Sequence, residues 1–321
     1  MTLIEELKKL SLVVRENEPL KNHTTFQIGG PAKIYLEVSE PSKLVECLKI
    51  IKADGLNYML LGGGSNLVVS DNGFNGAVIK IKSRELKING EQVKVDSGYS
   101  LAGLIIKTLD AGLTGLEFEA GVPGSVGGAI KGNAGTYGEA MDQVVKTIEY
   151  LDDDLNIKTI TNEDCNFKYR HSIFKEHDAW LILSLILQLA KGDTQAGREL
   201  IDQRIKYRMD SQPYGCPSAG CTFKNIIYTE AIAEQLKKLD WEISPKFKEY
   251  KKIPAAWVIE NLGLKGKTIG KSQVSEKHAN YIINLGGAKA EEVVQLVSLI
   301  KQQVRDKVGI QLEEEIRYVG F

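Results

Sequence analysis

Two glycine-rich stretches constrain this chain more than any other feature of its sequence. The first, LLGGGSNLVV at 60–69, places three glycines directly after an apolar, strand-like run. The second, GLEFEAGVPGSVGGAIKGNAGTYG at 115–138, holds eight glycines interrupted by Pro, Ser and Asn. Glycine loses more conformational entropy on folding than any other residue, so an ordinary loop gains nothing from so many. We therefore expect the backbone at 115–138 to lie directly against a large flat ligand.

The first stretch has the composition of a phosphate-binding loop. Its glycines, followed by Ser65 and Asn66, expose consecutive backbone N–H groups that suit a phosphate or pyrophosphate. Taken alone, the same residues also fit a tight turn between two strands. Two glycine loops in neighbouring units favour an extended dinucleotide.

Two common nucleotide-binding motifs are not supported. Neither glycine stretch has the spacing G-x-G-x-x-G at a strand-to-helix turn, which marks a Rossmann nicotinamide site. The segment NLGLKGKT ends like a P-loop, but Asn261 stands where the first glycine belongs and a helix-like segment precedes it. A dinucleotide bound by this chain therefore requires another architecture.

The composition is that of an ordinary globular protein. With 321 residues, of which 43% are hydrophobic, the chain can form two or three packed units. A formal net charge of -1 predicts no bulk affinity for nucleic acid or anionic membranes. The first 20 residues lack a signal-peptide core, and the longest apolar run, AWLILSLILQLA at 179–190, is too short to cross a bilayer and predicts a buried strand. We expect a cytoplasmic protein.

The pattern of apolar residues predicts an α+β protein in three units. In residues 1–82, an N-terminal helix and a helix at 41–55 precede a strand, the first glycine loop and two further strands. Residues 83–192 contain a strand at 91–98, a helix at 99–112 and a hairpin at 147–161 that is closed by Asp and Asn. Residues 193–321 contain helices at 193–210, 228–239 and 289–308 and a final strand at 310–321.

The stretch PSAGCTFKN at 217–225 isolates one of four cysteines among small and polar residues. Its thiol, Cys221, is a candidate nucleophile, metal ligand, proton donor or packing group. The four cysteines are scattered along a chain without secretory features, so we expect free thiols. Zinc is disfavoured because Cys216 and Cys221 have no second pair of ligands, and we expect no metal site.

Two charged segments are further candidates for a site. In NFKYRHSIFK at 166–175, the planar fork of Arg170 suits a carboxylate or an enolate oxygen, although an edge strand with a solvated cationic face is the simpler interpretation. In LEEEIRYVG, Glu313 and Glu315 share one face of the predicted strand, with Glu314 opposite. Such acids are usually surface charge, but one that is turned into a closed cleft can act as an acid or orient another group.

Taken in order, these segments resemble the UDP-N-acetylenolpyruvoylglucosamine reductase (MurB) family. The resemblance runs from Asn22 to Gly320, and the direct passage from YRHSIFK through one strand to the third unit is similar to the shorter form, which lacks an inserted tyrosine loop. It rests on the ordered motifs NHTTFQIGGPA, LGGGSNLVV, GLEFEAGVPGSVGGA, NAGTYG, YRHSIFK, PSAGCTFKN, AAWVIENLGLKGKTIG, QVSEKHANYIIN and GIQLEEEIRYVG.

The resemblance implies noncovalently bound FAD in a two-part domain of the vanillyl-alcohol-oxidase (PCMH) type. Residues 1–82 would hold the N-terminal helix and the first FAD-binding subdomain, 83–192 the second subdomain, and 193–321 the α+β substrate-binding domain with a C-terminal catalytic strand. The residues implied to bind FAD are Gly62, Gly63, Gly64, Ser65 and Asn66 at the pyrophosphate, and Pro123, Gly124, Ser125, Gly128 and Asn133 around the flavin.

The reaction implied is the NADPH-dependent reduction of UDP-N-acetylglucosamine enolpyruvate to UDP-N-acetylmuramate, a step of peptidoglycan precursor synthesis. Hydride would come from FAD N5 and a proton from Cys221, which matches the position of the family's proton-donating serine. A thiol with a pKa of ~8.5 is a stronger acid than an alcohol, so the cysteine is an apt replacement. Arg170 and Glu315 match the family's stabilising residues, and Asn225, Lys265 and His278 are implied contacts of the sugar nucleotide.

Two other functions fit parts of the sequence. Another FAD oxidoreductase of the same domain family would act on an alcohol or hydroxy acid, and such enzymes often tether the flavin through a histidine, for which His23 is a candidate. A catalytically idle nucleotide-binding protein would bind FAD without oxidising NADPH. We expect a monomer whose partners are the sugar nucleotide and NADPH, with neither nucleic acid nor membrane among them.

Overall fold

The computed structural model of the protein describes residues 2–321, which form two compact units. Unit 1 contains the residues up to Glu18, Ala32–Gly63 and Phe74–Arg208. Unit 2 contains Pro19–Pro31, Gly64–Gly73 and Met209–Phe321. Each unit is therefore assembled from segments that are separated in the sequence. The predicted division of the chain after residues 82 and 192 stays a prediction.

A four-stranded sheet in unit 1 leads into the first glycine loop. Its strands lie in the order β1 (Val13–Pro19), β2 (Pro31–Val38), β5 (Phe74–Ile81) and β3 (Tyr58–Leu61). Strand β5 runs parallel to both β2 and β3, and the loop follows the carboxyl end of β3. Ligands of parallel sheets bind at such carboxyl ends.

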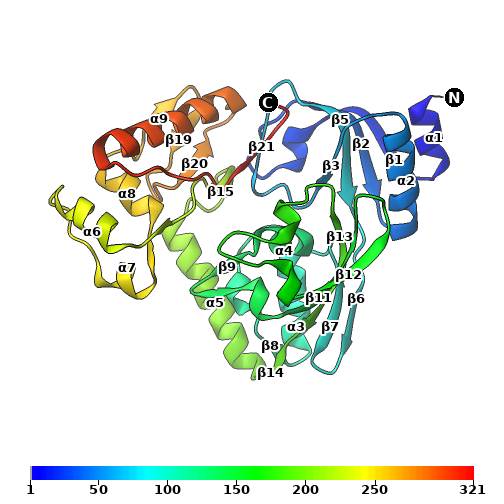
Figure 1. Ribbon diagram of the computed structural model, residues 1–321, viewed down its shortest axis with the longest axis horizontal. Coiled ribbons are helices and arrows are strands. Elements are labelled where there is room, and N and C mark those ends of the chain that lie inside the picture. Colours follow the sequence, from blue (N-terminus) through cyan, green and yellow to red (C-terminus); the bar gives the residue numbers. More distant parts are fainter. Residues whose placement is uncertain (1) are drawn as a thin grey trace. The chain divides into compact units, whose positions relative to one another are not determined.

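Two helices pack on this sheet. Helix α2 (Pro41–Ala53) buries Leu44, Cys47, Leu48 and Ile51, which recur at the helical spacing predicted from the sequence. Helix α1 (Leu3–Lys9) contacts α2 (Figure 1). Thr2 forms a capping box with Glu5 at the start of α1. The predicted N-terminal α/β arrangement is confirmed.

The second sheet of unit 1 is antiparallel. Its strands lie in the order β12 (Ile157–Thr161), β11 (Val145–Leu151), β13 (Leu181–Gln188), β7 (Gln92–Asp96) and β6 (Leu86–Asn89). Strand β13 is the predicted buried apolar strand. The Asp152 carboxylate accepts hydrogen bonds from the N–H groups of Asp154 (3.0 Å) and Asn156 (2.8 Å), so it closes the predicted hairpin.

Helices and short strands complete unit 1. Helix α3 (Leu101–Asp110) begins at the N-cap Ser100, and α5 (Thr194–Ser211) leads towards the end of the unit. The remaining elements are α4 (Val126–Gly132), β8 (Leu113–Thr114), β9 (Gly135–Thr136), β10 (Glu139–Ala140), β14 (Ala190–Lys191), η2 (Glu117–Glu119), η3 (Met141–Gln143), η4 (Glu163–Cys165) and η5 (Ile173–Lys175).

Unit 2 is built on a second antiparallel sheet covered by helices. The strands lie in the order β15 (Ser218–Cys221), β20 (Tyr281–Asn284), β19 (Ser272–Val274) and β18 (Thr268–Ile269), and α9 (Ala290–Val308) packs on β18 and β19. Its other elements are η1 (Leu20–His23), β16 (Ile226–Ile227), α6 (Glu230–Lys237), α7 (Pro245–Glu249), β17 (Lys252–Ile253) and α8 (Ala255–Asn261).

A parallel strand pair joins distant parts of the chain in unit 2. Strand β21 (Arg317–Val319) pairs with β4 (Leu67–Val69), which directly follows the first glycine loop. The predicted strand at 310–321 is wrong in its first half, because the chain before Arg317 makes a single bridge, between Glu314 and Phe223. Glu313 and Glu315 therefore do not alternate on a regular strand.

None of the four cysteines, all within the described residues, forms a disulfide, as predicted from their spacing. Cys47 and Cys165 are buried, and burial raises the pKa of each thiol to about 12. Within residues 2–321, no helix is both long and apolar enough to cross a membrane.

Candidate active site

The two glycine stretches meet inside unit 1. A Cβ atom on Gly63 would lie 2.6 Å from the Cα atom of Gly124, and one on Gly62 would lie 2.7 Å from the hydroxyl oxygen of Ser125. Neither distance leaves room for a side chain, so glycine is required where the two backbones approach. The Nζ atom of Lys80 also donates a hydrogen bond to the carbonyl oxygen of Gly62.

The amides at the start of α4 are engaged by the protein itself. Val126 and Gly127 donate to the carbonyl oxygens of Tyr99 (2.9 Å) and Ser97 (2.8 Å). The hydroxyl of Ser125, the N-cap, accepts from the N–H of Gly128 at 3.3 Å. Ser125 and Gly128 thus shape the loop, and the N-terminus of this short helix is not an anion site.

Asn133 ends α4 and ties three segments together. Its backbone is left-handed, with φ of 41°, and its side chain is buried. The side-chain oxygen accepts from the N–H of Asp142 (3.0 Å), and the side-chain nitrogen donates to the carbonyl oxygen of Lys168 (3.2 Å). The side chain of this predicted cofactor residue therefore holds the turn that carries Arg170.

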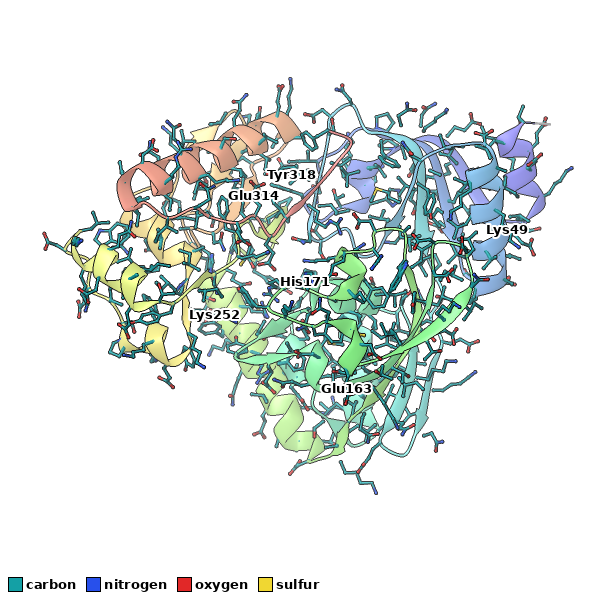
Figure 2. All side chains as sticks on the ribbon, viewed as in Figure 1. Lys49, Glu163, His171, Lys252, Glu314 and Tyr318 are labelled. Atoms are coloured by element: carbon teal, nitrogen blue, oxygen red, sulfur yellow. The ribbon has the colours of Figure 1, made fainter. Side chains whose placement is uncertain are left out.

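Arg170 lies in a tight turn. The edge strand that the alternating charges at 166–175 suggested does not form there. Lys168 and His171 exchange backbone hydrogen bonds of 3.1 and 3.0 Å across the turn. Arg170 has a left-handed φ of 57°, and Lys175 donates to its carbonyl oxygen at 2.7 Å. His171, labelled in Figure 2, pairs with Glu176 at 2.8 Å. The backbone under the guanidinium is therefore fixed.

In unit 2, the segment that carries Cys221 is joined to the C-terminal segment. The backbone N–H of Glu315 donates to the carbonyl oxygen of Thr222 at 2.8 Å. The Asn66 side chain donates to the carbonyl oxygen of Glu315 at 3.0 Å, and Arg317 donates to the carbonyl oxygen of Asn66 at 2.9 Å. Three predicted site segments, far apart in the sequence, are thus connected by hydrogen bonds.

A buried asparagine fixes the chain next to Cys221. Asn280 accepts from the N–H of Phe223 (2.9 Å) and donates to its carbonyl oxygen (2.8 Å), while Thr222 donates to the carbonyl oxygen of Asn280 (2.7 Å). Cys221 itself is half-buried and lies opposite Tyr281 in the β15–β20 pair. Sequence reasoning missed Asn280, which lies in the motif QVSEKHANYIIN.

Gly64 and Gly220 serve different needs in unit 2. A Cβ atom on Gly64 would lie 2.1 Å from the carbonyl oxygen of His23, so the motif NHTTF packs directly on the glycine loop. At Gly220 the nearest atom, the carbonyl oxygen of Ser65, would be 4.0 Å away, but its φ of 77° favours glycine. The peptide before Cys221 is therefore shaped by a left-handed residue.

The acids near the C-terminus differ in their surroundings. Glu313 is exposed and pairs with Lys224 at 3.0 Å, which agrees with surface charge. Glu314 pairs with Lys301 at 2.5 Å, and it also accepts a hydrogen bond from Tyr318, whose pKa is raised by burial and by this contact (Figure 2). The carboxylates of Glu313 and Glu314 are therefore both engaged by lysine side chains, and Glu315 stays the candidate for a role in the site.

The three predicted sugar-nucleotide residues lie in unit 2. The Asn225 side chain accepts from the N–H of Ala255 at 3.2 Å, at the start of α8. Lys265 pairs with Glu260 at 2.5 Å. Burial lowers the pKa of His278, with a smaller contribution from the charge of Lys265. The positive charge of Lys265 is therefore close enough to His278 to disfavour protonation of its imidazole.

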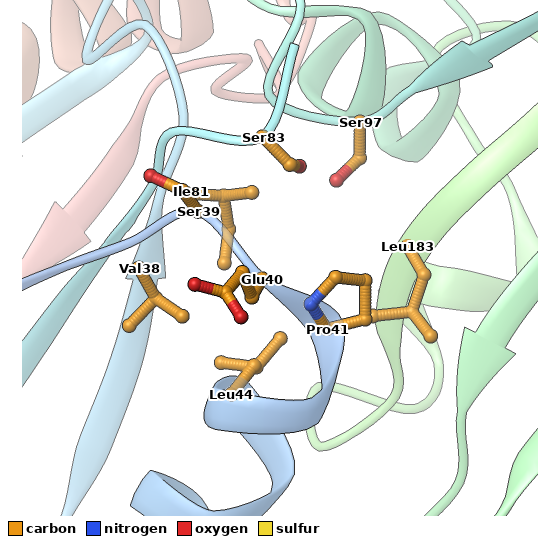
Figure 3. A pocket seen from close by; sticks show the side chains of 9 residues that line it. All are labelled: Val38, Ser39, Glu40, Pro41, Leu44, Ile81, Ser83, Ser97 and Leu183. Carbon is orange, nitrogen blue, oxygen red and sulfur yellow. The ribbon is translucent and has the colours of Figure 1, made fainter. Parts of the chain in front are cut away.

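A small pocket in unit 1 lies at the carboxyl ends of β2 and β5. Its walls combine apolar side chains, among them Leu44 and Leu183, with the hydroxyl groups of Ser39, Ser83 and Ser97 (Figure 3). Sequence reasoning did not find it, because its residues come from segments that are far apart in the chain.

Comparison with known proteins covers nearly the whole chain. Residues 32–160 match a FAD binding domain family, and residues 212–319 match the C-terminal domain of UDP-N-acetylenolpyruvoylglucosamine reductase. The reductase of this name from Bacillus subtilis (strain 168) is 36% identical over 321 residues, covering 99% of this chain and 98% of that protein. Its counterpart from Caldanaerobacter subterraneus subsp. tengcongensis is 35% identical over 324 residues, covering 99% and 98%.

A solved structure agrees with these sequence matches. The crystal structure of UDP-N-acetylenolpyruvylglucosamine reductase (MurB) from Thermus caldophilus is 28% identical, has a TM-score of 0.74, and covers 96% of this chain and 98% of its own. The predicted α+β fold, with a FAD-binding part and a separate C-terminal domain, is thereby confirmed. Because the similarity extends through both parts and does not rest on one motif, the chain belongs to the UDP-N-acetylenolpyruvoylglucosamine reductase family.

Proposed function

We propose that this chain reduces the enolpyruvyl group of UDP-N-acetylglucosamine enolpyruvate, with NADPH as the electron donor, and so forms UDP-N-acetylmuramate. The observation that carries the proposal is the hydrogen-bonded connection of Asn66, Thr222 and Glu315 in unit 2. It brings a predicted cofactor loop together with the two segments predicted to carry a proton donor and a carboxylate. Peptidoglycan precursor synthesis is the process that this reaction serves.

The residues present fit FAD. A Cβ atom on Gly63 would meet the backbone of Gly124, so the two glycine-rich loops lie side by side, as expected if both contact one dinucleotide. We assign the loop from Gly62 to Asn66 to the pyrophosphate, and the loop from Pro123 to Ser125, with Gly128 and Asn133 behind it, to the flavin. When FAD is bound, it supplies the hydride, which it has received from NADPH.

Arg170 and Glu315 are assigned to the charge that develops on the substrate. Hydride addition to an enol ether conjugated with a carboxylate builds negative charge on that carboxylate. A guanidinium that is held in place before the reaction stabilises this charge without reorganisation. The turn that fixes the Arg170 backbone supplies such support. Glu315 either orients a neighbouring group or takes part in proton transfer.

Cys221 is assigned the proton. A thiol can donate a proton to a carbon atom, and a half-buried position permits contact with a ligand. The proton goes to the carbon next to the one that accepts hydride, which leaves a thiolate that solvent reprotonates. Asn225, Lys265 and His278 are assigned to the sugar nucleotide.

The test is an assay of NADPH oxidation with and without UDP-N-acetylglucosamine enolpyruvate. We expect oxidation that depends on the substrate and forms UDP-N-acetylmuramate. A FAD-loaded protein that neither oxidises NADPH nor reduces the substrate would be an idle binding protein. Acid denaturation tests the other alternative, because release of all flavin into solution opposes a histidine-tethered alcohol or hydroxy-acid oxidase.

A further inference from the structure

Glu119, the last residue of η2, is a fully buried acid that the assignments above do not use. Its exposed fraction is 0%. Neither carboxylate oxygen accepts a hydrogen bond from any of residues 2–321. Buried carboxylates are normally paired or hydrogen-bonded, because removing a charge from water is costly. The position of this acid therefore requires a physical explanation.

One cation lies beside the backbone that follows Glu119. Arg208, on α5, is 8% exposed, and its Nε atom donates to the carbonyl oxygen of Ala120 at 2.8 Å. Its Cδ atom is 2.8 Å from the position that a Cβ atom on Gly121 would take. The Nη2 atom of Arg208 is buried and has no acceptor among the described residues. The guanidinium is thus packed against the loop that leads to Pro123.

Arg170 is the second cation that acts on this acid. Burial raises the pKa of Glu119 to about 7, while the charges of Arg170 and then Arg208 oppose that rise. The carboxylate and the two guanidinium groups, contributed by η2, the 168–171 turn and α5, therefore form one electrostatic cluster in unit 1.

Other charged groups near this cluster are directed elsewhere. Glu117, on the same element, accepts from the N–H of Gly115 at 2.7 Å. Glu139, on β10, pairs with Arg204 at 2.9 Å. On the turn, His171 pairs with Glu176. The negative charge that faces the two guanidinium groups from η2 is therefore that of Glu119.

We propose that Glu119 is a positioning residue, which serves as the internal counter-ion of Arg170 and Arg208 and takes up a proton when the carboxylate of the substrate reaches Arg170. The inference rests on the proposed function, because it uses the assignment of Arg170 to that carboxylate. Like charges in a shared low-dielectric site disfavour ionisation of both groups. The incoming carboxylate therefore drives Glu119 to its neutral acid, with a proton from solvent and no other change in bonding.

Protonation of Glu119 removes the negative charge that offsets the two guanidinium groups, so the positive potential at the substrate carboxylate increases. In the ligand-free protein, the carboxylate keeps two cations together and reduces their mutual repulsion. Once it is neutral, it no longer competes with the charge that grows on the substrate during reduction. Glu119 would thus adjust the electrostatics of Arg170 without contact with the substrate.

The experiment measures proton uptake on binding. Oxidised, FAD-loaded enzyme is titrated with UDP-N-acetylglucosamine enolpyruvate, without NADPH, in calorimetry at pH 6 and pH 8 in buffers of different ionisation enthalpy. At pH 8 we expect uptake that approaches about one proton per bound substrate, and little uptake at pH 6, where Glu119 is already protonated. Affinity should weaken by up to about tenfold per pH unit above neutrality.

Two variants separate this effect from a structural one. In Glu119→Gln the uptake at pH 8 should vanish, and binding should become tighter than in the unsubstituted protein at pH 8 but similar at pH 6. The matched control, Glu117→Gln, removes a buried acid of the same element and should keep the uptake. Equal uptake in Glu119→Gln and the unsubstituted protein, or none in the latter at pH 8, would overturn the proposal.

Failure of the proposed function has a different signature. If Arg170→Ala binds and reduces the substrate normally, the role of Arg170 is wrong, whatever Glu119 does. If Arg170 is required but Glu119→Gln leaves the uptake unchanged, the present inference alone fails. Should Glu119→Gln not fold, as judged by circular dichroism and FAD retention, uptake by the unsubstituted protein at the two pH values still decides the matter.

Discussion

The backbone N–H of Glu315 donates to the carbonyl oxygen of Thr222, the residue that follows Cys221, at 2.8 Å. This hydrogen bond couples the placement of the candidate carboxylate to that of the candidate proton donor. Asn66 adds a second link, to the carbonyl oxygen of Glu315, from the predicted pyrophosphate loop. Both links use backbone groups of Glu315, so a substitution of its side chain can remove the carboxylate and leave these links in place.

The first prediction concerns Gly63. A Cβ atom there would lie 2.6 Å from the Cα atom of Gly124, so Gly63→Ala must push the two loops apart. Overpacking of this kind costs about 1–3 kcal/mol, and we expect FAD affinity to fall about 10- to 100-fold. Gly132→Ala is the control, since nothing lies within 4 Å of its Cβ position. Equal FAD affinity in both variants, measured by flavin fluorescence, would contradict the placement.

The second prediction concerns Arg170. Arg170→Ala should fold and bind FAD but slow the oxidation of reduced flavin by substrate roughly 10²–10³-fold, because the guanidinium stabilises charge mainly in the transition state. Lys168→Ala removes an exposed cation from the same turn and should react normally. Rapid-mixing absorbance at the flavin bands measures both. A normal rate in Arg170→Ala would mean that the guanidinium does not stabilise the transition state and is only a solvated charge.

The equivalent change at the C-terminal segment is Glu315→Gln. It keeps the backbone links to Thr222 and Asn66 and removes the charge alone. We expect flavin reduction by NADPH to persist and the second half-reaction to slow by about tenfold or more. The control is Glu313→Gln, at an exposed surface pair. Similar rates in the two variants would indicate that Glu315 is placed by its backbone and does not act through its carboxylate.

The stability of the protein should depend on the charge of Glu119. Burial raises its pKa to about 7 in the folded chain, against 4.5 as the usual value, so the folded state holds a proton that the unfolded chain has released. Its contribution to stability is therefore present at acidic pH and is lost as pH rises through 7. Glu119→Gln removes this loss and should increase the free energy of unfolding by about 3 kcal/mol at pH 8, with much less effect near pH 5. Urea unfolding at both pH values, with saturating FAD, measures the difference, and an equal effect at both would contradict the assigned pKa.

Elements with a regular apolar pattern could be predicted from the sequence. Helix α2, the buried strand β13 and the hairpin closed by Asp152 all follow from local spacing, and the structure confirms them. The family and its FAD-binding fold could be recognised because several motifs occur in a fixed order, and the comparisons confirm both. The three elements depend on neighbouring residues, and the family depends on the order of motifs along the chain, so both can be recognised without knowledge of spatial contacts.

Features that depend on long-range contacts could not be predicted in the same way. The segment before Arg317 has the alternation of a strand, yet its polar groups find partners near Thr222, and a regular ladder does not form. Arg170 alternates with aromatic residues but adopts a left-handed turn, which a period of two cannot reveal. Glu119 looks like surface charge within GLEFEAG, and its burial beside Arg208 depends on a helix almost 90 residues away.

The last prediction separates hydride transfer from proton transfer at Cys221. Cys221→Ser places a hydroxyl where the thiol was and should remain active, whereas Cys221→Ala should lose roughly 10²–10⁴-fold in turnover, the usual contribution of a positioned acid. Flavin reduction by NADPH should survive in both, because it needs no proton from this residue. Cys216→Ala, at an exposed thiol, is the control and should behave normally. Stopped-flow spectra resolve the two half-reactions, and an unchanged second half-reaction in Cys221→Ala would mean that the thiol is not the proton donor and only packs.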